Sequence, residues 1–200
     1  MGSKKESNFI NMVLTLFLVA AIAAMALGGV YVVTKEPIAL AKKKKLEAAI
    51  KSVMPEFDSI TTKRVADADG GDSLTFYIAS KNNEVLGAAV KTYTMNGFSG
   101  KIELMVGFLN DGTINNTAVL MHKETPGLGD KMDIKKSDFP TQFKGKNPAN
   151  FKLKVTKDKG DVDAITAATI SSRAFCDAVQ RGYDTFKESG IRSQESGNSN

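Results

Sequence analysis

The N-terminal part of the chain is dominated by one long apolar run. From Phe9 to Val33 it reads FINMVLTLFLVAAIAAMALGGVYVV, and Asn11 is its one strongly polar side chain. Roughly 25 apolar residues in a helix are enough to cross the hydrocarbon core of a bilayer. A cleaved signal peptide is the alternative, but its apolar part usually has only about 7–15 residues. We therefore expect a retained transmembrane helix at 9–33, after a short tail at 1–8.

Helical periodicity resumes after this run. Lys43–Met54 has apolar residues at the spacing of one helix face, and Pro55 then stops the helix. The sequence therefore predicts a linker helix at 34–56, which joins the membrane span to a folded domain. The apolar face of this helix contains Leu46, Ala49, Ile50 and Val53.

The next part of the chain alternates apolar strands with short polar turns. Strands are predicted at Leu74–Ala79, Glu84–Tyr93, Ile102–Leu109 and Thr113–Met121. Asn110-Asp111-Gly112 is a strong hairpin signal, because these residues tolerate positive φ. Short links between successive strands indicate an antiparallel meander.

The C-terminal part mixes short elements with one long helix. Asp133–Lys144 is expected as a short helix or loop, and Phe151–Val155 and Val162–Ile165 as further strands. Thr169–Glu188 is predicted to be an amphipathic helix. Its expected buried face contains Ile170, Phe175, Val179, Tyr183 and Phe186. The pattern predicts an α+β domain at 57–189 and a polar, disordered tail at 190–200.

Composition and charge limit the classes of partner. Hydrophobic residues make up 42% of the chain and charged residues 24%, which is enough apolar side chain for a packed core. The net charge of +5 is local, since the run Lys42–Lys45 supplies four of the 27 basic residues and leaves 23 against 22 acidic ones. A nucleic-acid footprint needs basic residues spread over a binding face, so we expect no nucleic-acid partner.

The lysines around the apolar run bear on its orientation. Lys4 and Lys5 precede the run, whereas Lys35 and Lys42–Lys45 follow it. The positive-inside rule would place the following domain in the cytoplasm, but long domains translocate largely regardless of charge. Charge alone leaves the orientation open.

Two residue types that often carry chemistry occur once each. Cys176 excludes an internal disulfide and any multi-cysteine metal site, and a lone helical cysteine is usually a small buried apolar residue. His122 has no nucleophile-elbow GxSxG motif with which to form a triad, so a loop or capping role is favoured.

The stretch HKETPGLG follows the last strand of the predicted meander. Gly127 and Gly129 flank Leu128, and glycines let backbone N–H groups approach a flat or anionic ligand closely. The leucine would then cover an apolar face. A tight turn after a strand explains the same pattern, so both interpretations stay open on spacing alone.

The stretch DAITAATISS, Asp163–Ser172, combines small and hydroxyl side chains just before the long helix. Threonine suits a helix N-cap, and unpaired N–H groups together with the macrodipole stabilise a phosphate at a helix N-terminus. Ala167 and Ala168 leave room beside the backbone. An ordinary threonine-capped helix is the alternative, so the pattern indicates a phosphate site without identifying its ligand.

These motifs together resemble one known family. DAITAATIS at 163–171 is similar to the D-x-x-[ST]-G-A-T-x-[ST] motif of FMN-binding domains, and HKETPGLG resembles the second hallmark of that family. Gly97–Ile102, followed by Val106-Gly107, resembles its glycine-containing hairpin. Three motifs in the right order, with the N-terminal span, extend the resemblance over nearly the whole chain. Ala167 departs from the glycine most common there, which is tolerable where the backbone is helical or extended.

The resemblance implies a cofactor and its attachment site. In the family, FMN is bound covalently through its phosphate to the last threonine of the motif, which is Thr169 in this chain. Thr166, Ala167 and Ala168 would hold the phosphate, and Asp163 would help to position the motif. The residues expected to line the flavin are Glu124, Thr125, Gly127 and Leu128. The resemblance implies neither an acid–base catalyst nor a metal ligand.

The resemblance also implies a membrane redox complex. The short chain and single span are most similar to a flavin subunit of Rnf-type complexes, ferredoxin:NAD⁺ oxidoreductases coupled to Na⁺ or H⁺ translocation. The expected partners are the other subunits, membrane lipid, and a flavin transferase that uses FAD and Mg²⁺. The expected location is the bacterial inner membrane, with the FMN domain on the non-cytoplasmic side.

Three alternatives stay open. A similar subunit, usually longer, belongs to the sodium-translocating NADH:quinone reductase. The same fold without flavin would serve as a membrane-tethered interaction module. A hydrolase built on His122 is the third alternative, although the sequence has no recognisable nucleophile motif for it.

Overall fold

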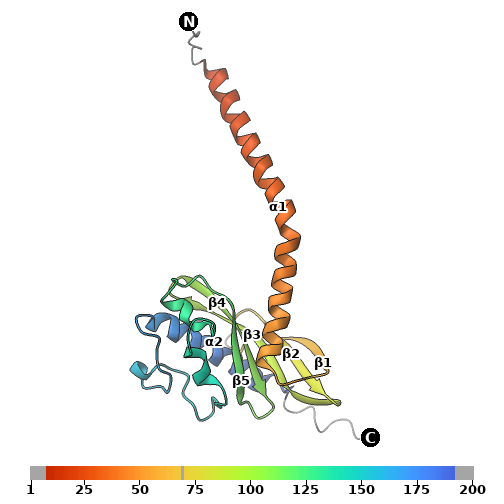
Figure 1. The fold of residues 1–200 in the computed structure, drawn as a ribbon, viewed down its shortest axis with the longest axis vertical. Helices are drawn as coiled ribbons and strands as arrows, with labels where there is room; N and C mark the ends of the chain where they lie inside the picture. Colours follow the sequence, from red (N-terminus) through yellow and green to blue (C-terminus); the bar gives the residue numbers. More distant parts are fainter. Residues whose placement is uncertain (1–7, 69, 192–200) are drawn as a thin grey trace. The chain divides into compact units, whose positions relative to one another are not determined.

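The computed structural model describes residues 8–68 and 70–191, so most of the expected tails at 1–8 and 190–200 lies outside the described residues. The chain consists of two compact units, and the boundary between them lies between Lys44 and Lys45. Helix α1 (Phe9–Val53) supplies the described part of the first unit and ends within the second (Figure 1). The α+β domain makes up the rest of the second unit.

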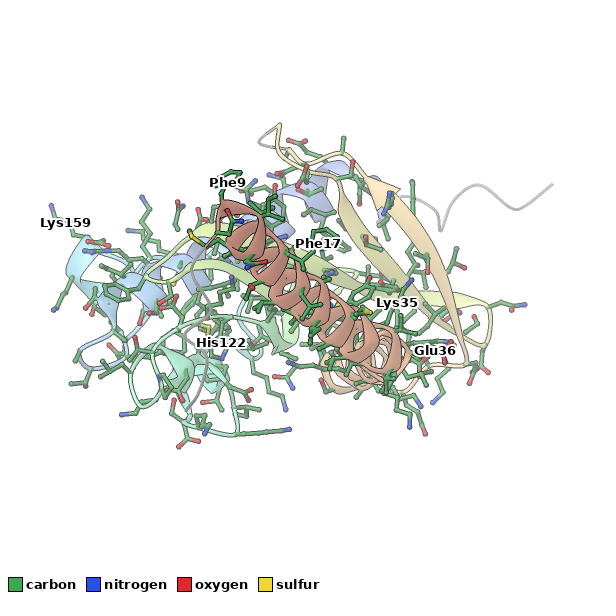
Figure 2. All side chains as sticks on the ribbon, turned by 90° about the horizontal axis from the view of Figure 1, so that it is seen from above. Phe9, Phe17, Lys35, Glu36, His122 and Lys159 are labelled. Carbon is green, nitrogen blue, oxygen red and sulfur yellow. The ribbon has the colours of Figure 1, made fainter. Side chains whose placement is uncertain are left out.

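The first unit is an apolar helix with an exposed surface. An 18-residue window of α1 has a mean hydropathy of 2.5, and none of it is buried. Figure 2 shows Phe9 and Phe17 projecting from the helix. By length and composition, α1 is the one candidate membrane span in the described part of the chain. The helix continues through Pro37, so the span and linker predicted separately belong to one element.

The core of the second unit is a five-stranded antiparallel sheet with the strand order β1-β2-β3-β4-β5. The strands are β1 (Ser59–Val65), β2 (Leu74–Lys81), β3 (Glu84–Gly97), β4 (Gly100–Leu109) and β5 (Ile114–Met121). The meander of four predicted strands and the α+β class are therefore confirmed. β1 was not predicted, because its residues are exposed except for the partly buried Val65, and no buried alternation marks it.

The strands predicted at Phe151–Val155 and Val162–Ile165 are wrong. Val155 is buried, as the alternation implied, but its segment folds back on the turn that follows. The Val162 amide donates to the carbonyl of Lys154 at 3.0 Å, and one isolated parallel bridge pairs Val155 with Val162. Apolar alternation shows which side chains are buried, and a folded-back loop can satisfy it as well as a strand.

Helix α2 (Thr169–Glu188) lies across one face of the sheet, with the predicted bounds (Figure 1). Phe186 stacks on Phe108 of β4, with 5.3 Å between the ring centroids. Ile170 differs from the prediction, because its side chain is 47% exposed. The other predicted core residues of this helix are buried, namely Phe175, Val179, Tyr183 and Phe186.

Three short 3₁₀ helices, η1 (Gly129–Met132), η2 (Phe139–Phe143) and η3 (Thr156–Asp158), lie between β5 and α2. The aromatic rings of η2 pack against Phe175 of α2, with centroid distances of 5.3 Å for Phe139 and 4.9 Å for Phe143. The short helix or loop expected at Asp133–Lys144 is therefore η2 and its flanks. This aromatic cluster fixes the N-terminal half of α2.

The last turns of α1, from Lys45 onward, cover the opposite face of the sheet. Ala49, Ile50 and Val53 are buried there, as the helical spacing predicted. A Cβ on Gly107 of β4 would lie 2.0 Å from the Val53 carbonyl oxygen, so glycine permits this close approach. The Asn115 side chain donates to the same carbonyl at 2.8 Å and caps the end of the helix.

Candidate functional site

A cavity of about 320 Å³ lies at the N-terminal end of α2. Three segments that are far apart in the sequence line it: the β3–β4 turn, the loop after β5 and the start of α2. Its lining residues are Phe98, Glu124, Thr125, Leu128, Gly129, Ala167, Ala168, Thr169, Ile170 and Ser171. The volume falls in the range of about 300–1,000 Å³ that is usual for small-molecule and cofactor sites.

Glu124 connects the three segments. Its side chain is buried, and its Oε1 accepts a hydrogen bond from the Ser99 amide at 2.9 Å. Its Oε2 accepts a short hydrogen bond from the Ser171 hydroxyl. A buried carboxylate is tolerated only when donors compensate for its lost hydration, and these donors come from the other two segments. Glu124 therefore holds the cavity together as well as lining it.

Two glycines allow the segments to approach this carboxylate. A Cβ on Gly129 would lie 2.5 Å from Ser171 Oγ and 2.7 Å from Glu124 Oε2. A Cβ on Gly97, at the β3–β4 turn, would lie 2.9 Å from Glu124 Oε1. Any larger residue at either position would push apart the segments that form the cavity.

The start of α2 is fixed by Ser172, which is fully buried. Its Oγ accepts a hydrogen bond from the Ile165 amide at 2.9 Å and donates one to the Ala168 carbonyl at 3.0 Å. The Ser172 amide also donates to Ala168, so the N–H groups of 169–171 precede the first intrahelical bond. Unpaired amides of this kind, beside a cavity, are suited to binding a phosphate.

The alternative interpretation, in which a threonine caps α2, is wrong. Ala168 occupies the N-cap position and makes no side-chain capping bond. Thr166 lies in the preceding turn, and Thr169 is the first helical residue. The half-buried Thr169 side chain is therefore not used for capping and lines the cavity.

Ala167 adopts a backbone conformation that favours glycine. Its φ is +61°, in the left-handed region, so the helical or extended backbone that would make alanine tolerable here is not present. An L-residue other than glycine is destabilised there by about 1–2 kcal/mol. The turn before α2 thus gives a physical reason for a glycine at this position of the motif.

The predicted site residues divide into two groups. Gly127, Asp163 and Thr166 do not line the cavity. Gly127 has φ +79° in the loop, and the backbone of Asp163 is paired with the side chain of Gln142 at 2.8 and 3.0 Å. The six predicted residues that do line the cavity are Glu124, Thr125, Leu128, Ala167, Ala168 and Thr169.

Four lining residues were missed as site residues: Phe98, Gly129, Ile170 and Ser171. Phe98 and Gly129 stand within stretches that the sequence had already singled out, and Ser171 is the final hydroxyl position of the motif. Ile170 was assigned to the core because it fits the apolar spacing of α2. Apolar residues at a period of 3.6 mark one face of a helix, but they do not show which residues of that face other parts of the protein cover.

The single histidine and cysteine have structural roles. His122 Nδ1 accepts a hydrogen bond from the Glu124 amide at 3.1 Å, which shapes the loop after β5 (Figure 2). Burial raises the pKa of the Cys176 thiol to about 12. Among the described residues, no group of three or more His, Cys, Asp or Glu side chains could hold a metal ion.

Comparison with known proteins bears directly on this site. A model of the FMN-binding domain matches residues 97–184, a range that contains every residue lining the cavity. The G subunit of the ion-translocating oxidoreductase complex of Aliivibrio fischeri is 35% identical in an alignment 192 positions long, which covers 89% of this chain and 90% of the relative. The chain belongs to this family of oxidoreductase-complex subunits.

Two further relatives have the same subunit name, and their alignments also cover most of this chain. The G subunit of Vibrio vulnificus is 36% identical in an alignment 157 positions long, which covers 74% of each chain. That of Shewanella amazonensis is 35% identical in an alignment 182 positions long, which covers 86% of this chain and 84% of the relative. Because the alignment with the Aliivibrio protein covers most of both chains, the relationship extends beyond the FMN-binding domain. The cavity lies within the part of this chain that matches the FMN-binding domain.

Proposed function

We propose that this chain is a membrane-anchored electron carrier, the flavin subunit of an Rnf-type ferredoxin:NAD⁺ oxidoreductase that moves Na⁺ or H⁺ across the membrane. The observation that carries the proposal is the cavity at the start of α2, where all three motif segments meet beside Thr169. Its relatives are named as subunits of ion-translocating oxidoreductase complexes. FMN, when bound, would supply the electron-carrying chemistry, while the protein tethers and orients it.

The cavity suits FMN at both ends of that molecule. The unpaired N–H groups of 169–171 would bind the phosphate at the helix N-terminus. Leu128 and Phe98, whose side chains are 40% and 68% exposed, would provide apolar contacts for the flavin ring. Glu124 is already engaged by Ser99 and Ser171, so its role is to position the cavity walls.

Covalent attachment to Thr169 is the proposed maturation step. A flavin transferase would bring FAD and Mg²⁺ to the exposed side of the cavity. The Thr169 hydroxyl would form a phosphoester bond with the FMN phosphorus as the pyrophosphate bond of FAD breaks. AMP would leave and the hydroxyl proton would pass to solvent, so no oxidation or reduction is involved. Of the two α2 hydroxyls that line the cavity, that of Ser171 is buried and bonded to Glu124, which leaves the half-buried Thr169 as the acceptor.

We also propose that the domain lies on the non-cytoplasmic side of the bacterial inner membrane, anchored by α1. The candidate span supports the anchor. A cysteine introduced in place of the exposed Lys135 should react with a membrane-impermeant maleimide in intact spheroplasts. Reaction only after lysis would place the domain in the cytoplasm and contradict this orientation.

The attachment site is tested by co-expressing the full chain with a flavin transferase and measuring intact mass and in-gel flavin fluorescence. Wild type should gain one FMN group, and Thr169→Ala should gain none while it stays folded. Thr166→Ala is the matched control, and it should keep most of the label because Thr166 does not line the cavity. An unmodified wild type, or a Thr169→Ala chain that still carries flavin, would contradict the proposal.

A further inference from the structure

A larger hollow lies beside the cavity, between residues 148–159 and the outer face of α2. Its volume is about 980 Å³, and we call it the α2 groove. Ile170 lines both the groove and the cavity. The groove is therefore lined by the residue that directly follows Thr169, the proposed attachment site.

The α2 groove has a basic wall over an apolar floor. Three exposed lysines line it, and none of them forms a salt bridge with another described residue. They are Lys152, Lys154 and Lys159, and Figure 2 shows Lys159 at the outer end of its loop. Phe151, Leu153 and Ile170 contribute apolar surface between the charged groups.

The acidic residues of the groove are already engaged. Asp158 accepts two hydrogen bonds from Arg173, from Nε at 2.7 Å and from Nη2 at 2.8 Å. The hydrogen bond from Arg173 lowers the pKa of Asp158, so this carboxylate stays ionised and paired near neutral pH. Asp177 accepts hydrogen bonds from Thr94 and Asn96, at 2.5 and 3.2 Å. The unpaired charge left in the groove is therefore positive.

The backbone that carries the lysines is fixed before any partner binds. The Lys152 amide donates to Asp161 Oδ2 at 2.7 Å, and the Lys154 carbonyl accepts from the Val162 amide at 3.0 Å. A Cβ on Gly160 would lie 2.0 Å from that carbonyl oxygen, so the turn is closed tightly on itself. A backbone that is already ordered lowers the entropic cost of binding.

We propose that the α2 groove is the docking surface for an acidic face of the electron carrier that exchanges electrons with this subunit. The assignment rests on the proposed function. Unpaired lysines around apolar side chains match a partner surface that has carboxylates around an apolar centre. The groove volume of about 980 Å³ is much larger than the volume of a single small anion. Charge complementarity of this kind raises association rates, and salt weakens it.

The test compares two triple charge reversals in the full chain, within membranes that contain the whole complex. The groove variant is K152E/K154E/K159E. The control is K135E/K136E/K144E, which changes the net charge equally at exposed lysines that line neither hollow. FMN loading and thermal melting of each variant establish that it folds and matures. The readout is the rate of flavin reduction per bound flavin after addition of reduced ferredoxin, at low and high salt.

We expect the groove variant to be at least tenfold slower than wild type at low salt and to show little salt dependence. The control should stay within about twofold of wild type. A neutralised K152Q/K154Q/K159Q variant should fall between them. Equal rates and salt dependence in loaded wild type and groove variant would overturn this assignment alone. Loss of FMN loading in the groove variant only would assign the groove to the transferase, and a wild type without flavin would overturn the proposed function as well.

Discussion

Glu124 accepts a short hydrogen bond from Ser171, 47 positions further along the chain, and this contact joins the loop after β5 to the first turn of α2. Ser171→Ala should destabilise the full chain by about 1–3 kcal/mol, because a buried carboxylate oxygen loses its donor. Glu124→Gln should cost less, since its amide can still accept from Ser99 and donate to Ser171. Thermal unfolding in detergent, followed by circular dichroism, measures both. Equal stability of wild type and Ser171→Ala would contradict the role given to this contact.

Gly129 and Gly127 stand two residues apart, and we predict that they resist substitution for different reasons. Gly129→Ala should both destabilise the chain and weaken flavin loading, because its Cβ would lie 2.5 Å from Ser171 Oγ. Gly127→Ala meets no neighbouring atom within 4 Å, so its cost should be limited to about 1–2 kcal/mol for its positive φ. Unfolding and FMN content of both variants separate the two effects. A Gly129→Ala chain with normal FMN content would show that the loop can move without harm.

Ala167→Gly should stabilise the protein by about 1 kcal/mol, because glycine adopts the left-handed backbone of this turn without the Cβ penalty. Its FMN content should equal or exceed that of wild type. Ala168→Gly is the matched control: at φ −135° the alanine is unstrained, so the same substitution brings no such gain. Thermal unfolding of the pair is the measurement. An Ala167→Gly chain less stable than wild type would mean that this turn is not strained.

Cys176 should be inert to alkylation in the folded chain. Burial raises its pKa to about 12, so the reactive thiolate is scarce at pH 8, and the folded protein also restricts access to it. Iodoacetamide labelling of native wild type should be at least tenfold slower than labelling of a Lys135→Cys variant, while both chains label fully in denaturant. Fast labelling of Cys176 would show that the core beneath the α2 groove opens readily.

The sequence predicted most of the fold because short apolar segments mark four of the strands and apolar residues at helical spacing mark α2. The strand limits follow from turn residues such as Asn110-Asp111-Gly112. β1 was not predicted, because this exposed edge strand has no buried face to produce an apolar pattern. Residues 151–155 were wrongly predicted as a strand, because alternate burial in a loop produces the same sequence pattern.

The candidate site was predictable only in part. Local motifs identified Thr169 and the loop at 124–129, since small residues and glycines are visible in the sequence. The pairing of Glu124 with Ser171 and the left-handed turn at Ala167 depend on contacts and dihedral angles that no local pattern encodes. Ile170 shows the same limit, because an apolar side chain can face a cavity as readily as a core.

The end of α1 also determines how a water-soluble form of this protein should be prepared. Deleting the chain up to Lys44 would remove the apolar helix and keep the turns that cover Ala79, Ala89 and Met105 of the sheet. A deletion that extended to Phe57 would uncover these side chains and leave Asn115 without the Val53 carbonyl that it caps. Such a shortened protein should aggregate, and its failure would be wrongly attributed to the missing membrane. Helix α1 and the domain therefore share residues 45–53, and a soluble form must begin no later than Lys45.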